Sequence, residues 1–515
     1  MDSSSQVLPL LFSFLLITTT FIFLVLRPWR KEKPSKSKQQ PPRALLPPGP
    51  RKLPIIGNLH QLATSKLLPH HRLLELANEH GPLMHLQLGQ LQTVIVSSAE
   101  MAKQVMKTHD LTFSNRPFLL AVDIISDNLN LVFAPYGEYW RQLKKLCVLE
   151  LLSAKRVASF LPIREQEVAR LIADICCKQG LATNVSRMIY SLTYRIISRS
   201  AFGKLYEVES SFVPVAMDII DAGSGFGVTD VYPSFKFLQL ITGVRSRLQK
   251  LKRESDRILQ SIIDEHIAAA KAGAGEKEEG VDDLVDVMLK VQKSADLGFT
   301  LTTDSVKAIL LDMFIAGSET SSTVVEWTMS ELIRDERVMK KAQAEVRAEF
   351  GKRRKVEETG IDELNYLKMV IKESLRLHPP LPLLVPRESL NQCEMEGFQI
   401  PEKTKVIVNA WAIGRDPKYW SEPERFYPER FVSSNSVDYK GNDFEFIPFG
   451  AGRRICPGIS FGVANVETAL ANLLFHFDWK LPGGMKPESL DMSELFGATV
   501  RRKNDLNLIP TVWQA

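Results

Sequence analysis

The chain has 515 residues, of which 44% are hydrophobic and 24% charged, so it is long enough for one large globular domain or for two or three smaller ones. Its five cysteines form no C-x-x-C pair and its nine histidines no H-E-x-x-H motif, which argues against a disulfide framework, a zinc ribbon and the commonest zinc hydrolases. The net charge is +5, but residues 27–52 alone carry +8, which leaves −3 for the rest. Because the body of the chain is nearly neutral, no nucleic-acid partner is expected.

Residues 1–26 predict an N-terminal transmembrane anchor. No residue from Ser3 to Leu26 is charged, and twenty helical residues span about 30 Å, the thickness of a bilayer's hydrocarbon core. The basic residues after this segment predict, by the positive-inside rule, a single-pass protein whose body faces the cytosol. A cleaved signal peptide is the alternative, but the apolar run is long, no Lys or Arg precedes it, and no A-x-A-like site comes after it.

Residues 27–52 are basic and proline-rich, and they predict a stiff hinge between the anchor and a single body at 53–515. Periodic segments in that body predict helices over 97–108, 137–152, 154–178, 185–201, 246–271, 282–292, 303–335, 336–350, 362–377 and 458–474. Short strands are expected at Met84–Leu88, Thr93–Ser97, Lys405–Asn409 and near the C-terminus. The body is therefore expected to be one large, mainly helical domain with a minor sheet.

The helix expected over 303–335 contains the polar segment Ala316-Gly317-Ser318-Glu319-Thr320. A glycine inside a helix costs about 1 kcal/mol relative to alanine, and hydroxyl groups compete for backbone carbonyls and bend helices. Taken alone, the segment is a harmless polar stretch. The functional interpretation is a kinked wall that makes room for a diatomic ligand, with an acid and a hydroxyl to supply protons.

The helix expected over 362–377 ends at Pro379-Pro380 and carries Glu373 and Arg376 on one face, three residues apart. An E-x-x-R pair occurs on many solvated helices and means little alone. Here the apolar neighbours predict a buried helix, where a charge needs partners. Arg430, in the later P-E-R-F segment, is a second arginine that could share Glu373.

The strongest local signal is the segment Phe449–Gly458, which reads F-G-A-G-R-R-I-C-P-G. It places Cys456 on a glycine-flanked bend that leads into an amphipathic helix. A thiolate at a helix N-terminus is stabilised by free backbone amides and by the helix dipole, and glycines let a flat macrocycle approach. For a lone Cys-Pro-Gly, the alternative interpretation is a buried cysteine with a purely structural role.

These segments together resemble the cytochrome P-450 family. Phe449, Gly452, Arg454, Cys456 and Gly458 match its F-x-x-G-x-R-x-C-x-G spacing, and the segment 47–58, Trp140–Lys144, A-G-x-E-T, E-x-x-R and P-E-R-F occur in its order over about the whole chain. The residues in these motifs are most similar to those of plant microsomal members that hydroxylate terpenoids and alkaloids. The resemblance implies a cytochrome P-450 fold with a single large haem domain, haem b as cofactor, and location in the endoplasmic reticulum membrane.

The resemblance also implies roles for individual residues. Cys456 matches the axial ligand of the haem iron, whose thiolate favours O–O cleavage in this family. Glu319 and Thr320 match the acid–alcohol pair that delivers protons. Glu373, Arg376 and Arg430 match a buried structural charge triad. The residues implied to bind the haem, mainly through its propionates, are Trp140, Arg141, Lys144, Arg387, Phe449, Arg454 and Arg116.

The substrate pocket is implied by the resemblance alone. Its contact regions would include Ile124, Met313, Phe314, Leu384 and Phe496. These side chains are apolar and suit a hydrocarbon-like substrate, although ordinary core packing explains any one of them equally well.

The expected activity is insertion of one oxygen atom from O2 into a small apolar plant-type secondary metabolite, a terpenoid before an alkaloid or phenolic. Electrons would come from NADPH through a separate reductase, because the chain has no flavin or nicotinamide fingerprint. That reductase is expected to dock near Lys144, Lys145 and Arg453. Two alternatives remain: a haem-thiolate isomerase or dehydratase without O2 activation, and a non-catalytic haem sensor or carrier.

Overall fold

The computed structural model describes residues 45–63, 65–203, 211–223, 227–272, 282–294, 300–432, 437–497 and 499–514. The predicted anchor, and the predicted hinge up to residue 44, lie outside the described residues. The compact body of the protein begins at Leu46.

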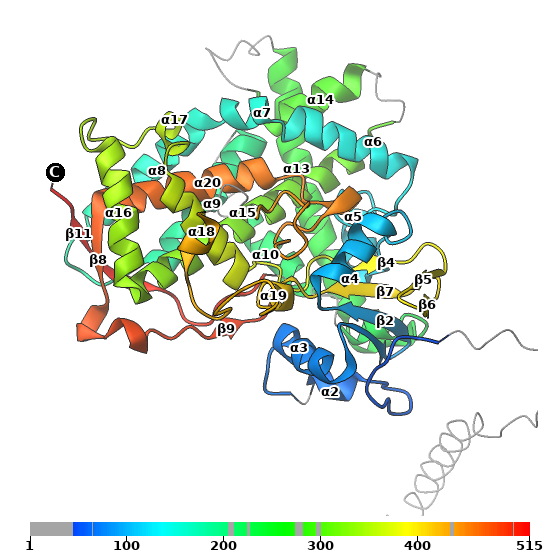
Figure 1. Cartoon of the computed structure of the whole chain (residues 1–515). Coiled ribbons are helices and arrows are strands. Elements are labelled where there is room, and N and C mark those ends of the chain that lie inside the picture. Colours follow the sequence, from blue (N-terminus) through cyan, green and yellow to red (C-terminus); the bar gives the residue numbers. More distant parts are fainter. Residues whose placement is uncertain are drawn as a thin grey trace, which may run out of the picture. The chain divides into compact units, whose positions relative to one another are not determined.

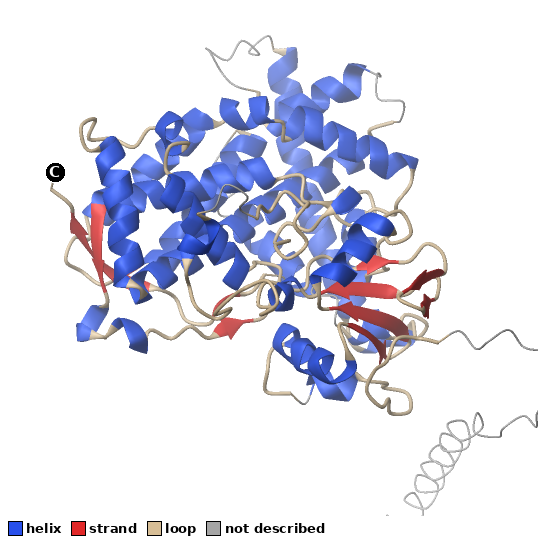
Figure 2. Ribbon diagram, in the orientation of Figure 1, coloured by secondary structure: helices blue, strands red, loops and turns tan. Residues whose placement is uncertain are grey.

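Helices make up most of the body (Figures 1 and 2). The helices before the central one are α2 (Leu59–Ala63), α3 (Pro69–His80), α4 (Ala99–Lys103), α5 (Leu120–Ser126), α6 (Glu138–Leu146), α7 (Ala154–Ser159), α8 (Leu161–Cys176), α9 (Val185–Phe202), α10 (Val213–Ala222), α11 (Val228–Val231), α12 (Phe237–Ile241), α13 (Val244–Lys271) and α14 (Leu284–Ser294). The central helix and those after it are α15 (Thr303–Arg334), α16 (Glu336–Phe350), α17 (Glu358–Ile361), α18 (Asn365–Leu377), α19 (Ala410–Ile413) and α20 (Ile459–His476).

Strands are short, with the largest sheet at one side of the body and a smaller sheet at the opposite side, as Figure 2 shows. The largest sheet has the order β1-β2-β7-β4, in which β2 and β7 are parallel and the other neighbours antiparallel. Its strands are β1 (Leu83–Leu88), β2 (Leu91–Val96), β7 (Lys405–Val408) and β4 (Arg387–Glu388). The smaller sheets contain β3 (Thr183–Asn184), β11 (Asn507–Val512) and β8 (Phe477–Lys480); β5 (Cys393–Met395) and β6 (Phe398–Ile400); and β9 (Glu494–Leu495) and β10 (Arg501–Arg502).

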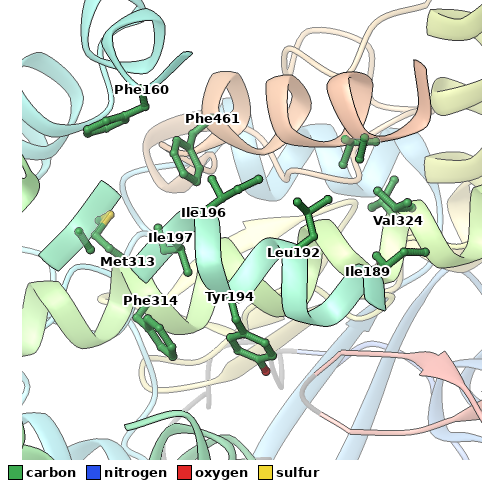
Figure 3. Packing of buried hydrophobic residues seen from close by; sticks show 14 of the residues in the cluster. Phe160, Ile189, Leu192, Tyr194, Ile196, Ile197, Met313, Phe314, Val324 and Phe461 are labelled. Carbon is green, nitrogen blue, oxygen red and sulfur yellow. The ribbon is translucent and has the colours of Figure 1, made fainter. Parts of the chain in front are cut away.

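The core is built around α15, which packs against α9 on one side and α20 on another. Figure 3 shows Leu192 and Ile196 of α9 among these helices, with Val324 of α15 and Phe461 of α20 nearby. Among the described residues, α15 is also the one helix long and apolar enough to cross a membrane, but 72% of its most apolar window is buried inside the body. Its apolar character is therefore that of a core helix.

The predicted fold class is confirmed, and most predicted helices and the first three strands occur within a few residues of their expected positions. The segment 154–178 is two helices, α7 and α8, rather than one. Pro162 lies in the first turn of α8, where its missing N–H costs nothing, so a new helix begins there. Sequence periodicity missed α3, α5 and α10, which are 12, 7 and 10 residues long and so have too few turns for a helical repeat to stand out.

Candidate functional site: a half-buried cysteine near the central helix

The loop that carries Cys456 is held in a narrowly defined conformation. The amide of Cys456 donates to the carbonyl of Phe449 at 3.0 Å, which closes the loop just before α20 begins. Gly452 has φ 69°, and a Cβ atom there would lie 2.1 Å from the carbonyl oxygen of Met106. Only glycine fits at that position. The loop is also tied to Asp110, whose carboxylate accepts the amide of Arg453 at 2.9 Å.

The surroundings of the Cys456 thiol shift its pKa in opposite directions. Burial raises the pKa of the thiol, whereas the backbone amide of Gly458 and the ammonium group of Lys144 act to lower it. A coordinated metal cation deprotonates a thiol outright, so a bound metal would complete the deprotonation that these two groups favour. The thiol is therefore suited to serve as a metal ligand.

Three guanidinium groups gather near this loop. Burial, together with repulsion from Arg454 and Arg387, holds the pKa of Arg116 well below its usual range. Burial and repulsion from Arg387 lower the pKa of Arg454 to about 9. Among the described residues, Asp110 is the one carboxylate that pairs with any of the three, through Arg387 at 3.1 Å. The surplus of buried positive charge fits an anionic group with two carboxylates, such as the propionates of haem.

Backbone carbonyls hold Arg116 and Arg454 without neutralising them. Arg454 donates to the carbonyl of Ala134 at 2.7 Å and stacks on the ring of Trp140 at 4.1 Å. Arg116 donates to the carbonyls of Val132 and Pro386 at 2.9 and 2.7 Å. Because carbonyl oxygens carry no net charge, the arginines are positioned while their charge stays available for a ligand.

The other residues predicted to bind haem lie in different surroundings. The indole N–H of Trp140 donates to the carbonyl of Leu131 at 3.0 Å, and Lys144 donates to that of Ile455 at 2.8 Å. Arg141 is exposed and pairs with Glu138 on its own helix, away from the three arginines. Phe449 is half-buried and packs edge-on against Tyr439, with ring centroids 5.3 Å apart.

One stripe of α15 keeps accessible surface although the helix runs through the core. Asp312, Ala316 and Thr320 are four residues apart and share this face, and Ala316 is exposed while Phe314 and Ser318 are buried. The helix is continuous here, and the Thr320 hydroxyl donates to the carbonyl of Ala316 at 2.6 Å. An accessible stripe inside a core marks the wall of an internal cavity.

The stripe lies close to the cysteine loop, because α15 crosses the start of α20. A Cβ atom on Gly317 would lie 3.6 Å from the ring of Phe461, and one on Gly462 would lie 3.7 Å from the hydroxyl of Ser321. Phe461 is only five residues after Cys456. The arrangement of stripe, cysteine loop and cations fits a flat, anionic, metal-containing cofactor.

Glu319 is buried on α15 three residues after Ala316 and seven after Asp312, so it lies on the same side of the helix as the stripe. Burial raises the pKa of its carboxyl group. The nearby Thr499 hydroxyl and Arg501 oppose this rise, and Asp221 adds to it. The carboxyl group is thus inclined to hold a proton, as a proton donor must be.

Glu373, Arg376 and Arg430 are brought together as the sequence predicts. Arg376 makes two bonds to the carboxylate of Glu373, at 2.7 and 2.8 Å, and both side chains are fully buried. Arg430 donates to the same carboxylate at 3.0 Å. The triad lies in α18 and the segment Pro428–Phe431, and Arg376 further binds the carbonyls of Gly414 and Pro423.

The five residues predicted to line the pocket lie in four separate segments. Ile124 is buried on α5, Met313 is buried on α15, and Leu384 is half-buried before β4. Phe496 is half-buried and stacks on His70, with centroids 6.4 Å apart. Phe314 is fully buried among the rings of Tyr194, Phe202 and Phe212, so its side chain serves the core; Figure 3 shows it beside Tyr194.

Two acids of the site were not found from the sequence. Asp110 ties Arg387 to the cysteine loop, and Asp312 accepts from the side chain of Asn130 and the amide of Val132, both at 3.0 Å. Asp312 lies two helical turns before Thr320, so the helical repeat could have placed it on the same face. No local signal points to Asp110.

A mainly helical body with a half-buried cysteine at the start of a helix, buried arginines and an accessible stripe on the central helix defines a haem-thiolate protein. The family model for cytochrome P450 matches residues 47–507, and the chain belongs to that family. It is accordingly a monooxygenase that binds haem b, with electrons supplied by a reductase as is usual in the family.

Relatives cover nearly the whole chain. It is 54% identical over 468 residues to desmethyl-deoxy-podophyllotoxin synthase of Sinopodophyllum hexandrum, covering 91% of this chain and 92% of that one. It is 48% identical over 506 residues to premnaspirodiene oxygenase of Hyoscyamus muticus, covering 97% and 99%, and 48% identical over 505 residues to salviol synthase of Salvia pomifera, covering 97% of each. A zebra fish cytochrome P450 solved with progesterone aligns over 87% of this chain and 100% of its own, with TM-score 0.72 and 25% identity.

Proposed function

We propose that the chain inserts one oxygen atom from O2 into a small apolar secondary metabolite of plant type, a terpenoid before an alkaloid or a phenolic. The observation that carries the proposal is the joint arrangement of Cys456, the unneutralised arginines and the accessible stripe of α15. The oxygenase and synthase names of the relatives support it. They also argue against an isomerase or a haem sensor.

Cys456 is the proposed ligand of the haem iron, with Arg116, Arg387 and Arg454 as partners of the propionates. The bound haem supplies the oxidising chemistry, and the protein supplies orientation, charge and protons. Trp140 holds Leu131 in place, and Lys144 holds the cysteine loop in place. Because the family uses these two positions to bind haem, the proposal also includes direct contact of both side chains with the haem.

The ligand assignment is tested by Cys456→Ser. A serine hydroxyl is a far harder ligand than a thiolate, so the red-shifted band of the reduced carbon-monoxide complex should be lost. Cys147→Ser is the matched control, because Cys147 is fully buried among hydrophobic core residues and should leave the band unchanged. Persistence of the band in Cys456→Ser would assign the ligand to another cysteine.

Thr320 and Glu319 are the proposed proton-delivery pair. Thr320→Ala removes one hydroxyl from a well-supported helix, and helix propensity favours alanine by a few tenths of a kcal/mol or slightly more, so folding should survive. Haem binding and the spectral response to substrate should persist, while NADPH consumption yields hydrogen peroxide instead of product. Thr320→Ser should restore much of the coupling. An unchanged ratio of product to NADPH in Thr320→Ala would show that Thr320 only packs.

The substrate class is tested by spectral titration and by product analysis. Dienes of the terpenoid type should shift the haem spectrum as water leaves the iron, and phenolics should do so more weakly. The product should gain one oxygen atom, derived from isotopically labelled O2. Tight binding of phenolics together with no response to any terpenoid would indicate that the substrate is a phenolic and not a terpenoid.

A surface cleft of about 420 Å³ supports a reductase-docking face near Cys456. Its lining combines cationic and apolar side chains, namely Tyr136, Trp140, Arg141, Lys144, Lys145, Val148, Leu149 and Arg453. Rim charges mainly govern the association rate and its salt dependence. Lys145→Glu should therefore slow reduction by the reductase most at low salt, whereas Lys293→Glu, on the exposed end of α14, should not.

Membrane attachment is proposed to involve the N-terminal anchor and an apolar surface patch on the body. Among the exposed side chains of α12, Leu240 and Ile241 are 75% and 77% accessible. Tyr232, just before α12, donates to the carbonyl of Ile55, which lies directly after the hinge and is itself exposed. Exposed apolar side chains gathered in this way favour insertion into a membrane surface.

Deleting Met1–Arg30 should leave a folded haem protein that is washed from membranes by carbonate. Adding Leu240→Ser and Ile241→Ser to the truncated chain should lower its residual liposome binding further. Leu181→Ser, at an exposed position outside the patch, is the control. Carbonate-resistant binding of the truncated chain would show that the anchor is not the main attachment.

A further inference from the structure

Beyond Glu319, one face of α15 remains polar as the helix enters the densest part of the core. Glu319, Thr323 and Glu326 are four and three residues apart and therefore share a face. Their accessible fractions are 5%, 0% and 2%. Two carboxyl groups and a hydroxyl in such a place are costly unless each has a partner.

The opposing surface belongs to α9, whose Ser186, Tyr190 and Tyr194 recur every four residues. The Ser186 hydroxyl donates to one oxygen of Glu326 and accepts the amide of Leu506 at 2.7 Å. Burial raises the pKa of Tyr190, and the charges of Glu326 and Glu319 raise it further. Tyr190 thus lies within electrostatic reach of both carboxyl groups.

Four polar atoms along this line are buried and make no direct hydrogen bond to any described residue. They are the second carboxylate oxygen of Glu326 and the hydroxyl oxygens of Tyr190, Thr323 and Thr499. The Thr323 hydroxyl lies near that of Tyr190 and acts to lower the pKa of Tyr190, and the Thr499 hydroxyl acts in the same way on Glu319, but none of the four atoms has a partner within hydrogen-bonding distance and angle. Buried polar atoms in proteins are almost always satisfied, and when no protein group is in reach, ordered water bonds them.

We propose that ordered water joins these atoms into a proton path that runs from Glu326, past Tyr190 and Thr323, to Glu319. The proposal rests on the proposed role of Glu319 and Thr320 in proton delivery. A proton that leaves the carboxyl group of Glu319 is replaced by one passed along the water and hydroxyl groups from Glu326. Glu326 then takes a proton from solvent, so that the path ends with its original charge.

The outer end of the path reaches solvent beside β11. Glu326 is close enough to Arg502 and Asp505 for both to influence its charge, and Asp505 is 49% accessible and lies 3.6 Å from the exposed Arg187. At the inner end, Glu319 faces Thr499, Arg501, Asp221 and Tyr194. Figure 3 shows Tyr194 with its hydroxyl group directed away from the packed side chains.

The path is tested by infrared spectroscopy of the Glu319 carboxyl band on transfer to heavy water, with the band assigned by its loss in Glu319→Gln. Glu326→Gln keeps the shape of the side chain but cannot release a proton, and Tyr190→Phe removes a hydroxyl without a cavity. Each of these two variants should slow exchange of the carboxyl proton by about a hundredfold, which is the lower end of the range for loss of a proton-transfer group. Ser322→Ala is the control, since its buried hydroxyl bonds back to its own helix, off the path.

An exchange rate in Glu326→Gln equal to that of the unchanged protein would overturn the path, as would high-resolution density without water at the four atoms. Circular dichroism and the carbon-monoxide band establish that each variant is folded. Failure of the proposed function gives a different result: Thr320→Ala would then leave the product-to-NADPH ratio unaltered, whatever the exchange rate. Uncoupling by Thr320→Ala together with unchanged exchange in Glu326→Gln rejects the path alone.

Discussion

The ammonium group of Lys144 on α6 lies 2.8 Å from the carbonyl oxygen of Ile455, the residue immediately before Cys456. The contact joins α6 to the cysteine loop 311 residues later in the sequence and places a cation near the thiol. It ties the charge of Lys144 to the conformation of the cysteine loop.

Lys144→Met should weaken that loop. It keeps the apolar stem but leaves a carbonyl without its donor, which should cost about 1–3 kcal/mol. The red-shifted carbon-monoxide band should therefore convert to the unshifted form at a lower concentration of denaturant. Lys145→Met, at the neighbouring exposed position, should leave that concentration unchanged. Equal behaviour of the two variants would mean that the contact with Ile455 does not stabilise the loop.

Removing one member of the buried ion pair should destabilise the body severely. Arg376→Ala leaves the carboxylate of Glu373 buried with a missing partner, which typically costs about 3–5 kcal/mol. Arg425→Ala breaks an exposed pair with Glu422 and should cost no more than about 1 kcal/mol. The free energy of unfolding in guanidinium, followed by loss of haem absorbance, distinguishes them. Similar losses would indicate that the carboxylate of Glu373 finds other partners.

Glu467 on α20 should make stability depend on pH. Burial raises the pKa of its carboxyl group to about 7; Lys368 opposes the rise, and Asp362 and Glu358 add to it. The unfolded chain releases this proton near the usual pKa of a glutamate, whereas the folded chain retains it up to about pH 7. The folded state therefore loses relative stability as pH rises between these values, and the loss is complete above pH 7.

Glu467→Gln removes that cost. The variant should match the unchanged protein at about pH 4.5 and should be more stable at pH 8, by at most about 3 kcal/mol. Thermal unfolding at both pH values measures the difference. Glu336→Gln, which gives up a surface contact with Lys340, should show no gain at pH 8. A gain from Glu467→Gln of equal size at both pH values would trace the effect to packing instead of charge.

Asp312 should control the cations near Cys456 although it touches none of them. Its carboxylate holds Asn130 and Val132, and the backbone carbonyls of Leu131 and Val132 in that segment hold Trp140 and Arg116. Asp312→Ala leaves two donors without their acceptor, which should cost about 2 kcal/mol or more and lower the haem content of the purified protein.

The matched variant for this prediction is Asp304→Ala, an exposed acid near the start of the same helix that pairs with Lys307. It should affect neither stability nor haem content appreciably. Normal haem retention in Asp312→Ala, despite a loss of stability, would separate the segment 130–132 from cofactor binding.

The sequence alone determined the cysteine loop and the central helix. Both depend on neighbours within a few residues: Gly450 and Gly452 adopt positive φ, and α20 begins just after Cys456. A short-range pattern of this kind can be predicted from the sequence, because it depends on backbone conformation and not on packing partners. The same holds for Glu373 and Arg376, which share a helix face three residues apart.

Only the tertiary structure decided which cations gather and which side chains face the cavity. Arg141 and Lys144 are three residues apart on α6, yet Arg141 pairs with Glu138 in solvent while Lys144 reaches Ile455. Met313 and Phe314 are adjacent, but Phe314 turns into a cluster of aromatic rings, because successive residues of a helix point about 100° apart. Contacts between segments hundreds of residues apart depend on how helices pack, and no local pattern encodes that.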